Sequence, residues 1–219
     1  MRLAIMQPYF FPYIGYFQLI AAVDQFVVYD KIKYTKKGWI NRNRMLQNGK
    51  DVMFTLPLKN DSDYLDVCER ELAVGFKRDK MLNQFKAAYR RAPYFYDTNL
   101  FSFLHNSIVK TCTHLGIATE IRISSDIAID HELKNQDKVL ALCEAVGAST
   151  YVNAIGGREL YSNETFGGKE IELKFIQSRP FEYAQLGDAF VPWLSIIDVM
   201  MFNSPEQVGV YVNECYELV

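Results

Sequence analysis

The sequence predicts an α/β fold of the Rossmann-like, three-layer α/β/α kind with a mainly parallel sheet. Short β-branched and aromatic runs alternate with helical patterns through most of the chain, as in strands joined by crossover helices. A strand, a loop, a helix and a second strand fit within the first 30 residues, and such a βαβ unit is nearly always parallel. The chain has 219 residues, of which 49% are hydrophobic. We therefore expect a single α/β domain over residues 1–219, with a helical insertion near residues 75–116.

The first βαβ unit is predicted from two apolar runs and the loop between them. Residues 3–6 form a short buried strand. Pro8 and Pro12 exclude one continuous helix, because proline lacks the backbone N–H that a helix needs. A helix then covers residues 16–23, and QFVVYD at residues 25–30 is a second buried strand. Ligands collect at the carboxyl ends of parallel strands, so the residues that follow each strand are candidates for a binding site.

The rest of the chain continues the alternation. Residues 52–58, VMFTLPL, predict a strand, and residues 171–176 alternate apolar and polar side chains as on an exposed edge strand. Gly116 and Gly147 each mark a helix end, because glycine readily adopts the left-handed conformation found there. The other predicted elements are helices over residues 75–92 and 99–115, a strand over 120–124, a helix over 135–146, a strand over 149–153, and helices over 195–203 and 205–218.

Composition and spacing exclude several classes of protein. The 24 basic and 26 acidic residues leave a net charge of −2, which argues against a general nucleic-acid binder. The four cysteines lie far apart and the three histidines share no short spacing, so we expect no metal site, and no cofactor is indicated. Prolines and glutamines interrupt the apolar N-terminal stretch, which suits neither a signal peptide nor a membrane helix. We expect a soluble cytoplasmic protein.

The loop after the first strand carries the first candidate site. In MQPYFFPYIGYF, residues 6–17, a strand leads into a proline-rich aromatic loop and then into a helix that starts near Gly15. Such a helix start presents backbone N–H groups to a phosphate. Gln7, Gly15, Tyr13 and Tyr16 are therefore candidate ligand-contacting residues. The alternative is that these aromatic side chains pack at the first sheet edge.

A basic stretch follows the second strand. Residues 31–44, KIKYTKKGWINRNR, contain six basic residues and no acidic residue. Arg42 and Arg44 lie on the same side of an extended segment, where they can bind a diphosphate or a carboxylate with Lys36 and Lys37 nearby. The alternative is an ordinary solvated loop.

A glycine-containing turn follows the strand predicted at residues 149–153. In NAIGGR, Gly156 and Gly157 allow close approach of a ligand to the backbone, and Asn153 and Arg158 can bind it. The alternative is a tight strand-to-helix turn. In both interpretations this turn lies on the same edge of the sheet as the loop after the first strand.

Asp30 is the candidate catalytic carboxylate, together with Tyr13 and Tyr16. It ends the second strand, where it can act as a general base or bind a ribose hydroxyl. The chain contains no Gly-x-Ser-x-Gly elbow, Walker loop or Gly-x-Gly-x-x-Gly fingerprint. Ser195 and Asp198 are interpreted as a Ser-x-x-Asp helix start.

Several ordered motifs make the chain resemble the WbqC-like family, which is found among bacterial surface-polysaccharide (O-antigen) biosynthesis proteins. The motifs are QPYFFPYIGYFQLI (residues 7–20), Asp24, Tyr29-Asp30, RNR (42–44), LPL (56–58), YVNAIGGRELY (151–161) and LSIIDVMMFNSPE (194–206). The resemblance covers nearly the whole chain. It implies a pathway class and does not specify a reaction.

A second resemblance concerns Tyr13-Ile14-Gly15-Tyr16, which is similar in position to the His-x-Gly-His loop of nucleotidylyltransferases. In those enzymes the two histidines hold nucleotide phosphates. Both are tyrosine here, and a neutral phenol donates one hydrogen bond but carries no positive charge near pH 7. Positive charge then has to come from the basic stretch.

Together these features predict a transferase of lipopolysaccharide (O-antigen) biosynthesis that acts on a phosphorylated or nucleotide-activated small molecule. Acyl or aminoacyl transfer to an amino-sugar nucleotide is a candidate reaction, since the amine needs only deprotonation once the donor is activated. The alternatives are a non-catalytic nucleotide- or sugar-nucleotide-binding protein and a scaffold that binds partner proteins of a biosynthetic complex.

Overall fold

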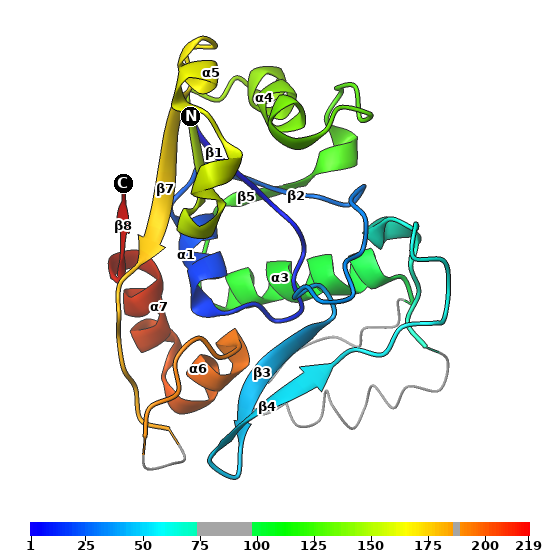
Figure 1. Cartoon of the computed structure of the whole chain (residues 1–219). Coiled ribbons are helices and arrows are strands. Elements are labelled where there is room, and N and C mark those ends of the chain that lie inside the picture. The colour runs from blue at the N-terminus through cyan, green and yellow to red at the C-terminus, as the bar shows by residue number, and fades with distance from the viewer. Residues whose placement is uncertain (74–97, 186–188) are drawn as a thin grey trace.

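The computed structural model describes residues 1–73, 98–185 and 189–219. Its main sheet contains β1 (Arg2–Met6), β2 (Gln25–Val28), β5 (Glu120–Ile123), β6 (Thr150–Ala154), β7 (Glu172–Ser178) and β8 (Tyr216–Leu218). These six strands lie in the order β5-β2-β1-β6-β7-β8 (Figure 1). All neighbouring pairs are parallel except β7 and β8, which are antiparallel. The prediction of a mainly parallel α/β sheet is confirmed.

Helices cover both faces of this sheet. They are α1 (Ile14–Ala21), α3 (Leu100–His114), α4 (Asn135–Val146), α5 (Asn163–Gly167), α6 (Ile196–Phe202) and α7 (Pro205–Glu214). Successive strand residues face opposite sides. On β1, Ala4 packs into a core with α1, α3, α6 and α7, whereas Leu3 and Ile5 pack into a second core with α4 and α5. Figure 1 shows α4 and α5 above the strands and α1 and α3 below them.

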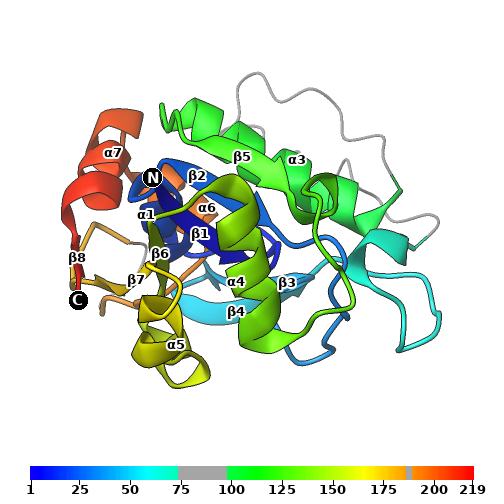
Figure 2. The same cartoon turned by 90° about the horizontal axis from the view of Figure 1, so that it is seen from above.

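The strand sequences explain this burial. All four residues of β2, Gln25–Val28, are buried, as expected for a strand that is covered on both faces. Figure 2 looks down on α4 and α5 and shows β1 and β6 behind them. Branched and aromatic side chains from the central strands therefore fill the space on each side of the sheet.

A separate hairpin consists of β3 (Arg42–Gln47) and β4 (Lys50–Thr55). Asn48 and Gly49 connect the two strands with φ angles of 53° and 72°, which is the left-handed geometry that a tight two-residue hairpin turn requires. The strand predicted over residues 52–58 therefore begins earlier and ends before Pro57. The extended backbone predicted for Arg42 and Arg44 is present as β3.

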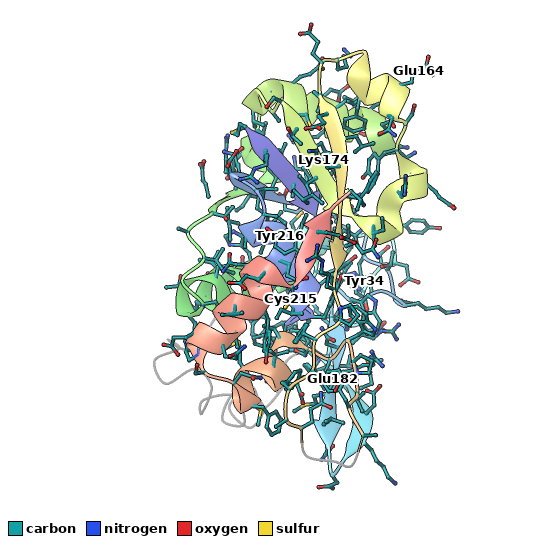
Figure 3. All side chains as sticks on the ribbon, turned by 90° about the vertical axis from the view of Figure 1, so that its left-hand side faces the viewer. Tyr34, Glu164, Lys174, Glu182, Cys215 and Tyr216 are labelled. Carbon is teal, nitrogen blue, oxygen red and sulfur yellow. The ribbon has the colours of Figure 1, made fainter. Side chains whose placement is uncertain are left out.

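The C-terminal segment differs from the prediction. The last helix is shorter than expected, and the chain leaves α7 through Cys215 to form β8 from Tyr216 (Figure 3). The buried Gln18 amide of α1 donates to the Tyr211 and Cys215 carbonyls at 2.9 and 3.0 Å, which fixes the end of α7. Because β8 pairs with β7, the strand predicted at a sheet edge is not the outermost strand.

The predicted helix ends are confirmed at two glycines. Gly116 follows α3 and Gly147 follows α4, and both have φ of 69°. The helix predicted over residues 75–92 lies outside the described residues, so a single domain with an insertion near residues 75–116 stays a prediction. Within the described ranges, no helix combines the length and the apolar character needed to cross a membrane.

Candidate functional site at the carboxyl edge of the sheet

Three adjacent strands bring residues from distant parts of the chain to one edge. Gln7 directly follows β1, Asp30 comes shortly after β2, and Asn153 lies near the end of β6. β1 lies between β2 and β6 in the sheet, and the three strands are parallel. Their ends therefore meet at the same side, which we call the carboxyl edge.

The two central strands stop pairing before they reach this edge. The ladder between β1 and β6 ends at Leu3↔Tyr151, whereas the ladders on either side of it run to the last residue of β1 and of β6. Moreover, α1 leads from β1 to one face and α5 leads from β6 to the other. In open α/β sheets, ligands bind where neighbouring strands connect in opposite directions. Gln7 and Asn153 flank this point.

Asp30 is 6% exposed, and its carboxyl group lies among hydrogen-bond donors. The Ser124 hydroxyl donates to Oδ1 at 2.7 Å, and the Ser125 N–H donates to the same oxygen at 3.1 Å. Burial raises the pKa of Asp30, but hydrogen bonds from both serines and from neighbouring backbone N–H groups have the larger effect and lower it below the ordinary value. Asp30 is therefore an ionised acceptor and a weak base near neutral pH.

The aromatic loop after β1 is held by two buried polar residues. Phe11 has φ of 42°, which is unusual for a bulky residue, and its carbonyl accepts from Asn43 Nδ2 at 2.8 Å and from Ser195 Oγ at 2.6 Å. Asn43 is 4% exposed and Ser195 is fully buried. The hairpin and the start of α6 thus fix the path of this loop toward α1.

Tyr13 and Gly15 lie at the start of α1. A Cβ atom on Gly15 would be 2.3 Å from Tyr13 Cε2, so the glycine is required for the tyrosine ring to pack against the helix. The Tyr13 hydroxyl has no hydrogen-bond partner among the described residues. Burial raises its pKa, which keeps the phenol neutral. Tyr13 is thus a free neutral donor beside the first turn of α1.

Tyr16 has a different environment from Tyr13. Its side chain is buried, and its hydroxyl donates to the Gln7 carbonyl at 2.9 Å. The two tyrosines that were predicted to act together are therefore not equivalent. Tyr16 holds the backbone of Gln7, whereas the Gln7 side chain has no hydrogen-bond partner within the described ranges.

The basic stretch is largely engaged with protein groups. Lys36 Nζ forms an ion pair with Asp63 at 2.8 Å. Arg42 donates through Nε to the Gly38 carbonyl at 3.0 Å and through Nη2 to the Lys37 carbonyl, which holds the loop before β3. Lys37 is exposed and its ammonium group has no acidic partner in the described part of the chain. A ligand-binding role for these residues stays a prediction.

Arg44 is held from two sides. Its Nη1 pairs with Asp51 at 2.5 Å, and its Nη2 donates to the Trp193 carbonyl at 3.3 Å. The Trp193 ring meets the Tyr13 ring edge-on, with centroids 6.0 Å apart. Arg44 is therefore joined to the start of α1 through Trp193, a residue that no sequence motif singled out.

The glycine turn after β6 forms the 3₁₀ helix η3 (Ile155–Leu160). Asn153 is 5% exposed, its Oδ1 accepts the Ala154 N–H at 2.9 Å, and its Nδ2 has no partner among the described residues. A Cβ atom on Gly157 would be 2.6 Å from that Nδ2, whereas one on Gly156 would meet nothing within 4 Å. Only Gly157 is needed for close packing on Asn153.

The Arg158 side chain extends from this turn toward β7. Its guanidinium carbon is 5.9 Å from the centroid of the Phe175 ring, and the side chain is exposed. It has no acidic partner among the described residues. Its positive charge is therefore available near the carboxyl edge, beside the Asn153 amide.

Four positioning residues were missed from the sequence. Asn43, Ser124 and Ser125 are single polar residues in or after strands, and Ser195 was interpreted as a helix cap. Ser195 does cap α6, since its hydroxyl accepts the Ile197 N–H at 3.3 Å. No motif spacing relates these residues to the groups they contact. Only Ser124 and Ser125 carry a weak sequence signal, because they directly follow the strand β5. Among the described residues, no three His, Cys, Asp or Glu side chains gather as a metal site would require.

Three of the motifs on which the resemblance rests contact one another in this structure. Asn43 of RNR and Ser195 of LSIID both donate a hydrogen bond to the Phe11 carbonyl in the loop of QPYFFPYIGYF. The sequence model of the WbqC-like protein family matches residues 7–210. The chain belongs to the WbqC-like family. The matched region of this family contains every candidate residue described above.

One relative has a curated description. The uncharacterized protein Rv1507c of Mycobacterium tuberculosis is 28% identical over 233 residues, covering 98% of each chain. No solved structure matches the chain. Family membership indicates a biosynthetic role for the chain.

Proposed function

We propose that this WbqC-like protein is a transferase of bacterial surface-polysaccharide biosynthesis that acts on a phosphorylated or nucleotide-activated small molecule in the cytoplasm. The reaction takes place at the carboxyl edge, between the ends of β1 and β6. The proposal treats the fold as a Rossmann-like three-layer arrangement, because such sheets bind their ligands at this point. Family membership supports the biosynthetic part of the proposal.

The observation that carries the proposal is a pair of side-chain amides, those of Gln7 and Asn153. They flank the point where the pairing between β1 and β6 ends. Asn153 is 5% exposed, and its Nδ2 group makes no hydrogen bond to a described residue, so this donor can bind a ligand. The Gln7 amide across the strand junction is likewise unpaired within the described ranges. A phosphate or acyl oxygen placed between them satisfies both donors.

The positive charge that binds an anionic donor substrate comes from side chains that have no acidic partner in the described residues. Arg158 follows Asn153, and Lys37 extends from the basic stretch. Tyr13 and the first turn of α1 add neutral N–H and O–H donors. This mixture suits a ligand whose negative charge is modest and fixed, such as a phosphate ester.

Asp30 has the role of an acceptor in this proposal. Its lowered pKa makes it unsuited to take a proton from a substrate at neutral pH, but an ionised carboxylate binds and orients a hydroxyl or an ammonium group well. We assign Asp30 to orienting the acceptor, either through a ribose hydroxyl or through the amine of an amino-sugar nucleotide.

Ligand-induced stabilisation tests the site. The wild-type protein is screened by thermal shift against nucleotide sugars, nucleoside triphosphates, sugar phosphates and amino acids, because a ligand at 100 times its Kd adds about 2.7 kcal/mol. Asn153→Asp replaces the free donor with an anion of the same shape and should abolish stabilisation by phosphorylated ligands. Asn213→Asp on α7 is the control, since Asn213 bonds only the Gly209 carbonyl. Equal stabilisation of both variants would contradict the proposed site.

A binding protein without catalytic activity is the competing function, and the state of Asp30 favours it. The hydrogen bonds to this carboxylate lower its pKa, so Asp30 is a weak general base. Mass spectrometry of wild-type protein incubated with a stabilising donor and an amino-sugar nucleotide separates the two functions. A transferase forms an acceptor that has gained the mass of the transferred group and releases the activating phosphate or nucleotide of the donor, and Asp30→Asn loses turnover while it retains donor binding. Stabilisation without any product supports the binding protein.

A further inference from the structure

Trp193 exposes a large apolar ring to solvent. Its backbone is also in an unfavourable conformation. The residue is 54% exposed, and its φ is 61°. For a bulky side chain this left-handed region is a genuine outlier, and such strain persists only where the surroundings enforce it. Its neighbour Leu194 is 2% exposed, so the chain turns from the surface into the core at this residue.

Contacts on both sides enforce the conformation. Before Trp193, the Gln185 side chain accepts the Val191 N–H at 2.8 Å and donates to its carbonyl at 3.0 Å. After it, the Ser195 N–H donates to the Arg44 carbonyl at 2.9 Å. The Trp193 carbonyl itself accepts from Arg44, whose Nε is buried without a partner. A partly buried guanidinium that also pairs with Asp51 thus holds the backbone of an exposed tryptophan.

The indole ring contacts Tyr13, one of the residues of the proposed site. It meets the Tyr13 ring at an interplanar angle of 74°, so the edge of one ring contacts the face of the other. Tyr13 in turn packs on Gly15 at the start of α1. Trp193 is therefore joined through the Tyr13 ring to the start of α1, where the proposed donors include the Tyr13 hydroxyl.

We propose that Trp193 is a stacking platform for a ring of the activated small molecule, and that Arg44 is the positioning residue that holds it there. The inference rests on the proposed function and adds the chemical class of the ligand: a flat ring with an apolar face joined to a phosphate. A nucleobase and a pyranose both have this character. Burying such a face against the indole removes apolar surface of both rings from water.

Fluorescence of single-tryptophan variants tests the platform directly. Trp39→Phe leaves Trp193 as the only indole of the chain, and Trp193→Phe leaves Trp39 as a matched control. Each is titrated with uridine monophosphate, adenosine monophosphate, glucose 1-phosphate and inorganic phosphate. We expect saturable quenching of Trp193 by a nucleotide, which assigns a nucleobase, or by the sugar phosphate, which assigns a pyranose. Inorganic phosphate should leave the emission unchanged, and Trp39 emission should not respond to any probe.

The affinity of variants for the quenching probe distinguishes a failure of this inference from a failure of the proposed function. Trp193→Ala should weaken binding of the quenching probe at least tenfold, Trp193→Phe should retain most of it, and Arg44→Lys should weaken it while altering the emission maximum of Trp193. Circular dichroism and melting temperature verify that each variant folds. A probe that binds wild-type protein and Trp193→Ala equally overturns the platform and leaves the proposed function standing. Binding by none of the ring-bearing probes overturns both.

Discussion

The Asn43 side-chain amide donates to the Phe11 carbonyl at 2.8 Å and to the Phe10 carbonyl at 3.0 Å, and so holds two consecutive peptide groups with one nitrogen. Phe11 is left-handed, and the Ser195 hydroxyl donates to the same carbonyl. The loop cannot relax without breaking both contacts. The geometry of Tyr13 and of the first turn of α1 therefore depends on a side chain in the hairpin.

Replacing Asn43 with alanine should destabilise the protein by about 2–4 kcal/mol, because it leaves two buried carbonyls short of a donor. Urea unfolding monitored by circular dichroism measures this loss. Asn213→Ala, which removes a single exposed bond to Gly209, should cost less than about 1 kcal/mol. Equal effects of the two changes would show that the Phe11 peptide is held by other contacts.

The two tyrosines of the loop should respond differently to loss of their hydroxyl groups. Tyr16→Phe removes the bond to the Gln7 carbonyl and should cost about 1 kcal/mol of unfolding free energy. Tyr13→Phe removes a hydroxyl that has no partner among the described residues, so stability should stay the same and only ligand binding should weaken. Paired melting curves and thermal-shift titrations measure both quantities. A destabilised Tyr13→Phe protein with unchanged ligand binding would assign that hydroxyl a structural role instead.

The Asp30 carboxyl should make stability depend on pH in a defined direction. Its folded-state pKa lies below that of an unfolded Asp, about 3.9, so its ionised form stabilises the protein above that pH. This contribution is lost as the pH falls through the folded-state pKa. Asp30→Asn should therefore be less stable than wild type by about 1–2 kcal/mol at pH 7, and the difference should shrink in acid.

Unfolding measured in urea from pH 7 down to about pH 3 checks this sign, because the unfolded Asp titrates near the lower end of that range. Ser124→Ala provides a second variant, since it removes the 2.7 Å hydrogen bond to Oδ1 while it leaves the carboxyl in place. It should reduce the pH dependence without abolishing it. A difference between wild type and Asp30→Asn that grows in acid would mean that the carboxyl is protonated in the folded protein.

Local patterns predicted the parallel strands because each is a short run of either continuous or alternating apolar residues. Two features were not predicted, namely the strand β8 and the register of the β3–β4 hairpin. β8 forms from Tyr216–Leu218, whose helical and extended propensities are similar, and pairing with β7 decides between them. The hairpin register depends on the Asn48-Gly49 turn, a signal that apolar periodicity does not contain. In both cases tertiary pairing outweighs the periodicity of a short segment.

The candidate site was predictable only at strand ends. Gln7, Asp30 and Asn153 were found because parallel strands place their carboxyl ends together. The contacts of Ser124 with Asp30 span 94 positions in the chain, and no local pattern encodes such a pairing. Likewise, the basic stretch indicated free charge, whereas Arg42 bonds backbone carbonyls of its own loop.

The two consecutive glycines after β6 provide the sharpest test of the Asn153 amide. In Gly157→Ala the new Cβ would be 2.6 Å from Asn153 Nδ2 and 3.4 Å from Cγ, so the amide has to move. It cannot move freely, because its Oδ1 accepts the Ala154 N–H at 2.9 Å. We expect a loss of about 1–3 kcal/mol of stability and loss of ligand-induced stabilisation. Gly156→Ala places its Cβ in open space and should preserve both. The side-chain amide resonance of Asn153 in nitrogen-15 NMR spectra should shift in the first variant only. If the two variants bind ligand equally well, the Asn153 amide is not part of the site.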